Sequence, residues 1–160
     1  MKKKAKIILA ILAVVLVFCL WYTRPRSFEE LTGDRSITYV GITAGVAENQ
    51  NGKAYTHAWS VDSSEGRDYV ISGMEDILKS CKYRVSLRSL LPFSSAFEIP
   101  GKGDILINIA AVMEDGSFFI GNYKGATATL EFDKTVIMQA ADKDISEKLL
   151  AYAQEFGQKK

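Results

Sequence analysis

The sequence is poor in the residues that build metal sites and activated nucleophiles. It has one histidine, His57, and two cysteines, Cys19 and Cys81. Because structural zinc sites combine several Cys and His ligands, a zinc site is nearly excluded. The chain also lacks a G-x-S-x-G nucleophile motif, a calcium-loop spacing, a phosphate-binding loop and a dinucleotide-binding fingerprint. We therefore expect no metal, no cofactor and no catalytic residue of a known motif.

The two cysteines are not expected to form a disulfide. Cys19 lies in an apolar N-terminal segment and Cys81 in the more polar remainder of the chain, so their sulfur atoms belong to different environments. Cys81 continues an apolar pattern of helical spacing, which predicts a buried free thiol. A single thiol in an oxidising compartment can also be reactive, and this alternative stays open.

His57 and the acidic residues are the remaining candidates for acid–base chemistry. His57 lies in the alternating segment THAW (56–59), where a histidine could act as a general base or a pH sensor. No nucleophile context accompanies it, which favours an ordinary strand histidine. The acidic residues come in pairs at expected helix starts and turns, where carboxylates cap helices. An envelope hydrolase or transferase that uses His57 or carboxylates is therefore the alternative, not the leading hypothesis.

Most of the chain is acidic, although its formal net charge is +1. Six of the 20 basic residues and none of the 19 acidic residues fall in residues 1–26, so residues 27–160 keep 14 basic against 19 acidic residues, a net charge of about −5. Nucleic-acid binding depends on neutralising phosphates with positive charge. We therefore expect no nucleic-acid partner.

Residues 1–26 (MKKKAKIILAILAVVLVFCLWYTRPR) contain the longest apolar run. As a helix, the apolar part at 7–22 is about 24 Å long, which leaves a cleaved signal peptide and a retained anchor open. No pair of small residues for a signal peptidase follows Leu20, and bulky Phe18 stands where a lipoprotein signal needs a small residue before its cysteine. These absences predict an uncleaved anchor that contacts the membrane through residues 6–22.

The flanks of the anchor predict its orientation. Trp21 and Tyr22 have the composition of an interfacial aromatic belt, and four lysines before the apolar run outweigh two arginines after it. We expect a single-pass cell-membrane protein with a cytoplasmic N-terminus and an extracytoplasmic domain at residues 27–160. A cleaved or acylated precursor, the alternative, would also place this domain outside the cytoplasm.

Residues 27–160 show the patterns of one α+β domain. Ser27 and Glu30 match a capping box at the start of a short helix, and Asp62 and Glu65 match another before a longer helix. Strands are expected at residues 37–46, 53–61, 82–88, 104–113, 118–123, 126–132 and 135–139, and longer helices at 66–81 and 142–156. The expected fold is a mainly antiparallel sheet with two amphipathic helices on one face, in the order ββα-β-ββββα.

Two stretches, SFEELTGDRSITYVGITAG (27–45) and MEDILKSCKYRVS (74–86), resemble the pattern of small bacterial extracytoplasmic α+β domains of unknown function that follow a membrane anchor or a lipoprotein signal. The resemblance covers most of residues 27–157, and the proline-containing loop at 89–103 departs from it. It implies a fold and a location, and it offers no catalytic residues.

Two segments are candidates for contact with a partner. Lys82, Arg84 and Arg88 alternate along one expected strand, so they would share one face in an otherwise acidic domain and could bind an anionic ligand. A solvated or protected sheet edge is the simpler interpretation.

The second segment is an apolar loop at 90–100, which contains Leu91, Phe93 and Phe97. This much apolar area either folds back onto the core or docks a protein or a membrane.

The leading hypothesis is a non-catalytic, membrane-anchored binding module of the cell envelope, with an envelope protein or an anionic ligand as its partner. Besides an enzyme, a regulatory subunit of a membrane complex is an alternative, although the apolar segment carries no strong helix-packing motif.

Overall fold

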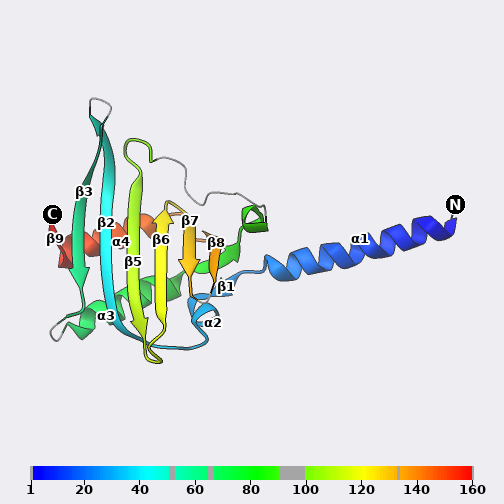
Figure 1. Ribbon diagram of the computed structural model, residues 1–160, viewed down its shortest axis with the longest axis horizontal. Coiled ribbons are helices and arrows are strands. Elements are labelled where there is room, and N and C mark those ends of the chain that lie inside the picture. The colour runs from blue at the N-terminus through cyan, green and yellow to red at the C-terminus, as the bar shows by residue number, and fades with distance from the viewer. Residues whose placement is uncertain (1, 51–52, 65–66, 91–99, 133, 160) are drawn as a thin grey trace.

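The chain is an α+β protein in which an apolar N-terminal helix precedes a large antiparallel sheet (Figure 1), and this part of the expected fold class is confirmed. The computed structural model describes residues 2–50, 53–64, 67–90, 100–132 and 134–159. The helices are α1 (Lys2–Tyr22), α2 (Phe28–Thr32), α3 (Asp68–Ser80) and α4 (Ile145–Phe156), with a 3-10 helix, η1, at Leu87–Leu90. The strands are β1 (Arg26–Ser27), β2 (Ile37–Gln50), β3 (Lys53–Asp62), β4 (Lys82–Val85), β5 (Ile105–Met113), β6 (Phe118–Lys124), β7 (Thr127–Glu131), β8 (Thr135–Ala140) and β9 (Gln158–Lys159).

The strands form one sheet in the order β1-β4-β8-β7-β6-β5-β2-β3-β9, with antiparallel neighbours. The most apolar strand, β5, is an interior strand between β6 and β2. The helix α1 leaves the domain near β1 and β8, and the C-terminus lies at the opposite edge with β9 (Figure 1). The two edges of the sheet therefore differ in their distance from α1.

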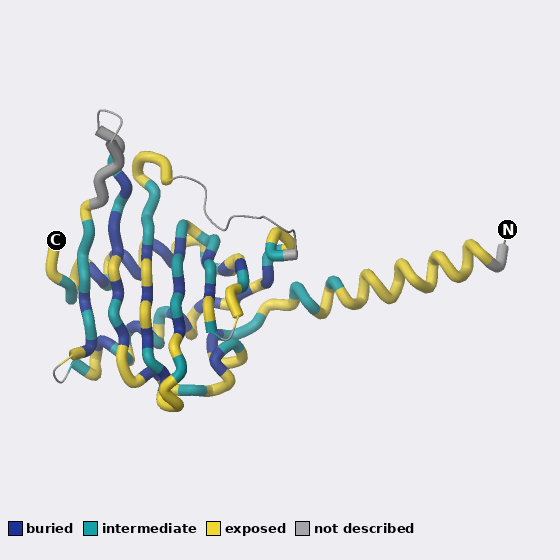
Figure 2. The backbone as a smooth tube through the Cα atoms, viewed as in Figure 1, coloured by how far each residue is buried: buried dark blue, intermediate teal, exposed yellow. Residues whose placement is uncertain are grey.

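The hydrophobic core lies between the sheet and two helices. Along β5, Ile107, Ile109, Ala111 and Met113 are buried, and the residues between them are more exposed. α3 and α4 pack against each other and against β2, on one face of the sheet (Figure 1). Strand alternation thus separates a core face from an open face, as the mixed burial along each strand shows (Figure 2).

A row of short polar side chains crosses the open face of the sheet. Thr43, Asn108, Asn122 and Thr129 follow one another across β2, β5, β6 and β7 in register. The amide nitrogen of Asn108 donates a hydrogen bond to the amide oxygen of Asn122 at 2.6 Å. Such polar side chains are typical of an antiparallel sheet with one face toward water.

Two local expectations require correction. The strand expected at 82–88 ends at Val85, because Ser86 begins a turn in which its carbonyl accepts hydrogen bonds from the backbone and hydroxyl of Ser89. Leu87, which a strand over 82–88 would place on the same face as Tyr83 and Val85, is 59% exposed, and Arg88 belongs to η1.

The capping box expected from Asp62 and Glu65 does not open α3, whose N-cap is Arg67, and Glu65 lies outside the described residues. That helix begins at Asp68 without a side-chain cap, while the Asp62 carboxylate accepts a hydrogen bond from the Ser64 backbone and the Ser63 hydroxyl accepts one from Val40. By contrast, the Ser27–Glu30 capping box is present and opens α2. The same local pattern therefore caps a helix in one place and closes a strand in the other.

Replacing Gly73 by alanine tests the packing between the two helices. Alanine normally stabilises a helix by about 1 kcal/mol relative to glycine. A Cβ at Gly73 of α3 would lie 2.7 Å from the hydroxyl oxygen of Tyr152 on α4. We therefore expect Gly73→Ala to lower the midpoint of thermal unfolding, while Ser72→Ala on the exposed side of α3 changes it little. An increase in the midpoint for Gly73→Ala would show that the two helices are not packed this closely.

Candidate functional site

The domain is joined to α1 by a short and well-packed connection. Tyr22, at the end of α1, packs partly against the core, and the guanidinium of Arg24 lies 3.8 Å from the carboxylate of Glu30. Ser27 caps α2, and the next residue, Phe28, is 2% exposed. The chain thus enters the core within a few residues of the end of α1.

Phe28 is the anchor point of this connection. Its ring lies edge-on to Phe119 at a centroid distance of 5.4 Å, and Tyr83 and Phe132 are each at 6.4 Å. An aromatic cluster of this kind combines a large buried apolar area with favourable edge-to-face contacts. It fixes α2, and therefore β1, against β4 and β6.

Strand β4 presents its basic side chains on the open side of the sheet. Tyr83 and Val85 are buried, whereas Lys82 and Arg84 are exposed. The part of the basic-strand prediction that concerns these two residues therefore agrees with the alternation observed. Arg88 lies outside β4, so strand alternation does not place it with them.

A hollow of about 330 Å³ adjoins β4 at this edge of the sheet. We call it the basic hollow, because three of its lining residues are the cations Lys82, Arg84 and Lys143. The other lining residues are Pro25, Tyr83, Gln139, Ala140 and Ala141. Among the residues that the structure describes, none that lines this hollow is acidic.

The three cations of the basic hollow are not neutralised by neighbours. All three are exposed, and among the described residues none of them takes part in an ion pair. In a domain with a net charge of about −5, three unpaired cations around one hollow create a local excess of positive charge. An arginine fork and two lysines are well suited to a phosphate or a carboxylate.

Lys143 is the residue that the sequence pattern did not reveal. It lies in the connection between β8 and α4, about 60 positions from β4 along the chain. It reaches the hollow because β8 pairs with β4, with Ala140 opposite Tyr83, and because the Ala141 backbone donates to the carbonyl of Lys82. Only the order of strands in the sheet brings these residues together.

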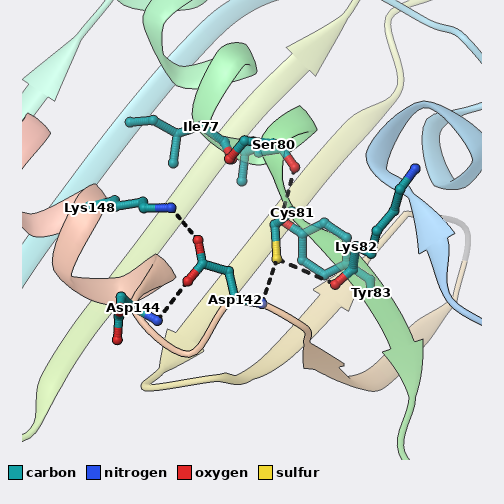
Figure 3. A network of polar contacts seen from close by, with 9 residues as sticks. Ile77, Ser80, Cys81, Lys82, Tyr83, Asp142, Asp144 and Lys148 are labelled. Atoms are coloured by element: carbon teal, nitrogen blue, oxygen red, sulfur yellow. Dashed lines mark hydrogen bonds and ion pairs between the residues drawn. The ribbon is translucent and has the colours of Figure 1, made fainter.

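A polar network behind β4 holds this connection in place (Figure 3). The Asp142 backbone lies 3.5 Å from the sulfur of Cys81, and the Asp142 carboxylate accepts a hydrogen bond from the Asp144 backbone at 3.0 Å. Lys148 of α4 forms an ion pair with Asp142. The hydrogen bond from Lys148, together with that from Asp144, lowers the pKa of Asp142.

This network has an electrostatic consequence for the basic hollow. Of the two carboxylates next to Lys143 in the sequence, that of Asp142 is paired with Lys148, and the side chain of Lys82 points away from the network (Figure 3). Asp142 is thus neutralised by Lys148 of α4 and forms no ion pair with the cations of the hollow. The expected burial of Cys81 is confirmed, since its side chain is 1% exposed and the thiol is free.

A second hollow, of about 290 Å³, lies at the opposite edge of the sheet. It is lined by residues of β3 and β9 together with Ser64 and Arg67. Its lining includes Asp62 next to Arg67, and the charge of Arg67 contributes to a lowered pKa of Asp62, after the larger effect of hydrogen bonds from Ser64. This hollow has a mixture of charges, so it is less suited to an anion than the basic hollow.

The remaining candidates of the sequence lie elsewhere. His57 is exposed on β3, with its Nε2 atom 3.4 Å from the carboxylate of Glu48, and it lines neither hollow. In the part of the chain that the structure describes, no three His, Cys, Asp or Glu side chains are grouped as metal ligands. The apolar-loop residues Leu91, Phe93 and Phe97 lie outside the described residues.

Comparisons of the chain with protein-family models, with curated proteins and with solved structures give no match.

Proposed function

We propose that the protein is a membrane-anchored, extracytoplasmic binding module without catalytic activity, and that its basic hollow binds the phosphate or carboxylate group of an anionic ligand. The observation that carries this proposal is the set of unpaired cations Lys82, Arg84 and Lys143 around one hollow of an acidic domain. The proposal takes α1 as the anchor and residues 27–160 as the domain that it holds outside the cytoplasm.

The length and composition of α1 support its role as an anchor. Residues Lys4–Tyr22 form a helix long and apolar enough to cross a membrane, properties that a signal sequence near an N-terminus shares. The full helix of 21 residues is about 31 Å long, close to the thickness of a bilayer core. Its apolar side chains are exposed rather than packed on the domain. The excess of lysine before the apolar run supports a cytoplasmic N-terminus.

The experiment is a titration of the full chain in nanodiscs of neutral phosphatidylcholine with inorganic pyrophosphate. Binding is followed by the NMR signals of the backbone amides of Ala140 and Ala141, which line the basic hollow. We expect saturable shifts that weaken at higher ionic strength, because exposed charge interactions are screened by salt.

A pair of charge-matched variants separates the hollow from general electrostatics. Lys82→Gln/Arg84→Gln removes two cations of the hollow, and Lys102→Gln/Lys134→Gln removes two exposed cations elsewhere. We expect the first variant to abolish the shifts and the second to keep them. Equal binding by both variants, or no saturable shift in the native chain, would contradict the proposal.

A further inference from the structure

The distance between the anchor and the basic hollow is limited by the chain itself. Three residues, 23–25, separate the end of α1 at Tyr22 from the start of β1 at Arg26. Since consecutive Cα atoms are 3.8 Å apart, the Cα atoms of Tyr22 and Arg26 lie within about 15 Å of each other. One of the three connecting residues, Pro25, itself lines the hollow.

Strand pairing places the basic side chains of β4 next to β1, the strand that follows the connection from α1. Ser27 of β1 is paired with Lys82 of β4, and paired strands lie about 4.8 Å apart. The polar headgroup layer of a bilayer extends about 5–8 Å beyond each side of its apolar core. With Trp21 and Tyr22 at the boundary of that core, Pro25, which lines the hollow, is at most three residues or about 11 Å away, so the hollow lies at or just outside the headgroup layer of the membrane that contains α1.

We infer that the headgroup phosphates of anionic lipids, from the same membrane that holds α1, occupy the basic hollow. This inference rests on the proposed function and names its ligand. The tether keeps the hollow permanently next to a high local concentration of lipid phosphate, so that modest affinity is sufficient for occupancy. Lysine and arginine residues close to an anionic membrane surface each favour contact with it.

The charge distribution supports a lipid surface as the occupant. The three cations of the hollow lie at the edge of the sheet next to α1, whereas the hollow at the far edge contains Asp62 beside Arg67. The domain as a whole is acidic, so an anionic membrane surface would repel it elsewhere. Occupied by headgroups, the basic hollow sets the orientation of the sheet, with the β1 and β4 edge on the membrane and the β3 and β9 edge away from it.

The test compares the full chain in two kinds of nanodisc, one of neutral phosphatidylcholine and one in which about a third of the lipid is anionic phosphatidylglycerol. No pyrophosphate or other soluble ligand anion is added. We expect the amide signals of Ala140 and Ala141 to shift in the anionic discs. Each basic residue near such a surface contributes roughly a fivefold preference, so Lys82→Gln/Arg84→Gln should weaken the lipid effect roughly 25-fold. The charge-matched control Lys102→Gln/Lys134→Gln should retain it.

The pyrophosphate titration and the lipid comparison together distinguish failure of the inference from failure of the proposed function. If pyrophosphate shifts the signals but anionic lipid does not, the hollow binds a soluble or polymeric anion and the lipid inference is overturned. If neither has an effect, the proposed function fails as well. If anionic lipid shifts the native chain and the Lys82→Gln/Arg84→Gln variant equally, the lipid effect does not arise in the hollow, and the inference is also overturned.

Discussion

Replacing Phe28 by alanine is expected to lower the free energy of unfolding by about 3–5 kcal/mol, the range observed when a buried phenylalanine is truncated. The ring of Phe28 is 2% exposed and contacts Tyr83, Phe119 and Phe132. Its loss leaves a cavity where α2 and the sheet meet. Denaturant unfolding of the full chain in detergent, followed by tryptophan fluorescence, measures the effect.

The sheet offers a matched control for this substitution. Phe118 is next to Phe119 on β6 but points to the open face, where it is 67% exposed. Phe118→Ala makes the same chemical change without a buried cavity and is expected to cost less than about 1 kcal/mol. Similar costs for the two variants would show that α2 is not packed into the core as described.

Replacing Tyr83 by phenylalanine is expected to cost more than the same change at Tyr123. The two buried hydroxyl oxygens are 3.2 Å apart, and the Tyr83 hydroxyl is also 3.4 Å from the carbonyl of Leu78. Without the Tyr83 hydroxyl, the Tyr123 hydroxyl loses this partner, and a buried unpaired group costs about 1–3 kcal/mol. Without the Tyr123 hydroxyl, that of Tyr83 keeps Leu78, and the expected cost is about 0.5–1.5 kcal/mol.

The double variant sharpens this prediction. Tyr83→Phe/Tyr123→Phe removes both hydroxyls and leaves neither unpaired, so its cost is expected to be smaller than the sum of the single costs. Denaturant unfolding of the three variants and the native chain completes the cycle. Additive costs, or a larger cost for Tyr123→Phe than for Tyr83→Phe, would contradict the hydrogen-bond arrangement.

The same tyrosine pair predicts a dependence of stability on alkaline pH. Burial raises the pKa of Tyr83 and of Tyr123 above the value near 10 of an exposed tyrosine. Above pH 10 the unfolded chain loses these protons while the folded chain keeps them, so stability falls as the pH rises. The slope should be about 1.4 kcal/mol per pH unit for each group, and Tyr83→Phe should reduce it by about that amount.

Local patterns predict part of the basic hollow and miss the rest for physical reasons. Period-two alternation placed Lys82 and Arg84 together on the outer face of a strand, because side-chain direction depends only on the local backbone. It could not find the end of that strand, which depends on hydrogen bonds that Ser86 makes in a turn. It also could not find Lys143, which requires the pairing of β8 with β4.

The fold shows the same division between local and non-local information. The apolar helix, the antiparallel sheet and the Ser27 capping box follow from periodicity and side-chain chemistry within a few residues. The pattern at Asp62 was ambiguous, because serine and aspartate stabilise helix starts and turns through the same hydrogen bonds. From the sequence alone, Gly73 only lowers the helix propensity of its segment. The structure shows that the absence of a side chain at Gly73 leaves room for Tyr152 of α4.

The central claim is that the β1 and β4 edge of the sheet rests on the membrane while the β9 edge points away. A fluorophore is attached at Leu87→Cys in η1, near the anchor side, or at Gln158→Cys in β9, in a Cys19→Ser chain whose other thiol, Cys81, is buried. Lipids with a nitroxide headgroup then quench each fluorophore according to its distance from the membrane surface. We predict strong quenching at position 87 and little at position 158. Equal quenching at the two positions, or stronger quenching at 158, would contradict the claim.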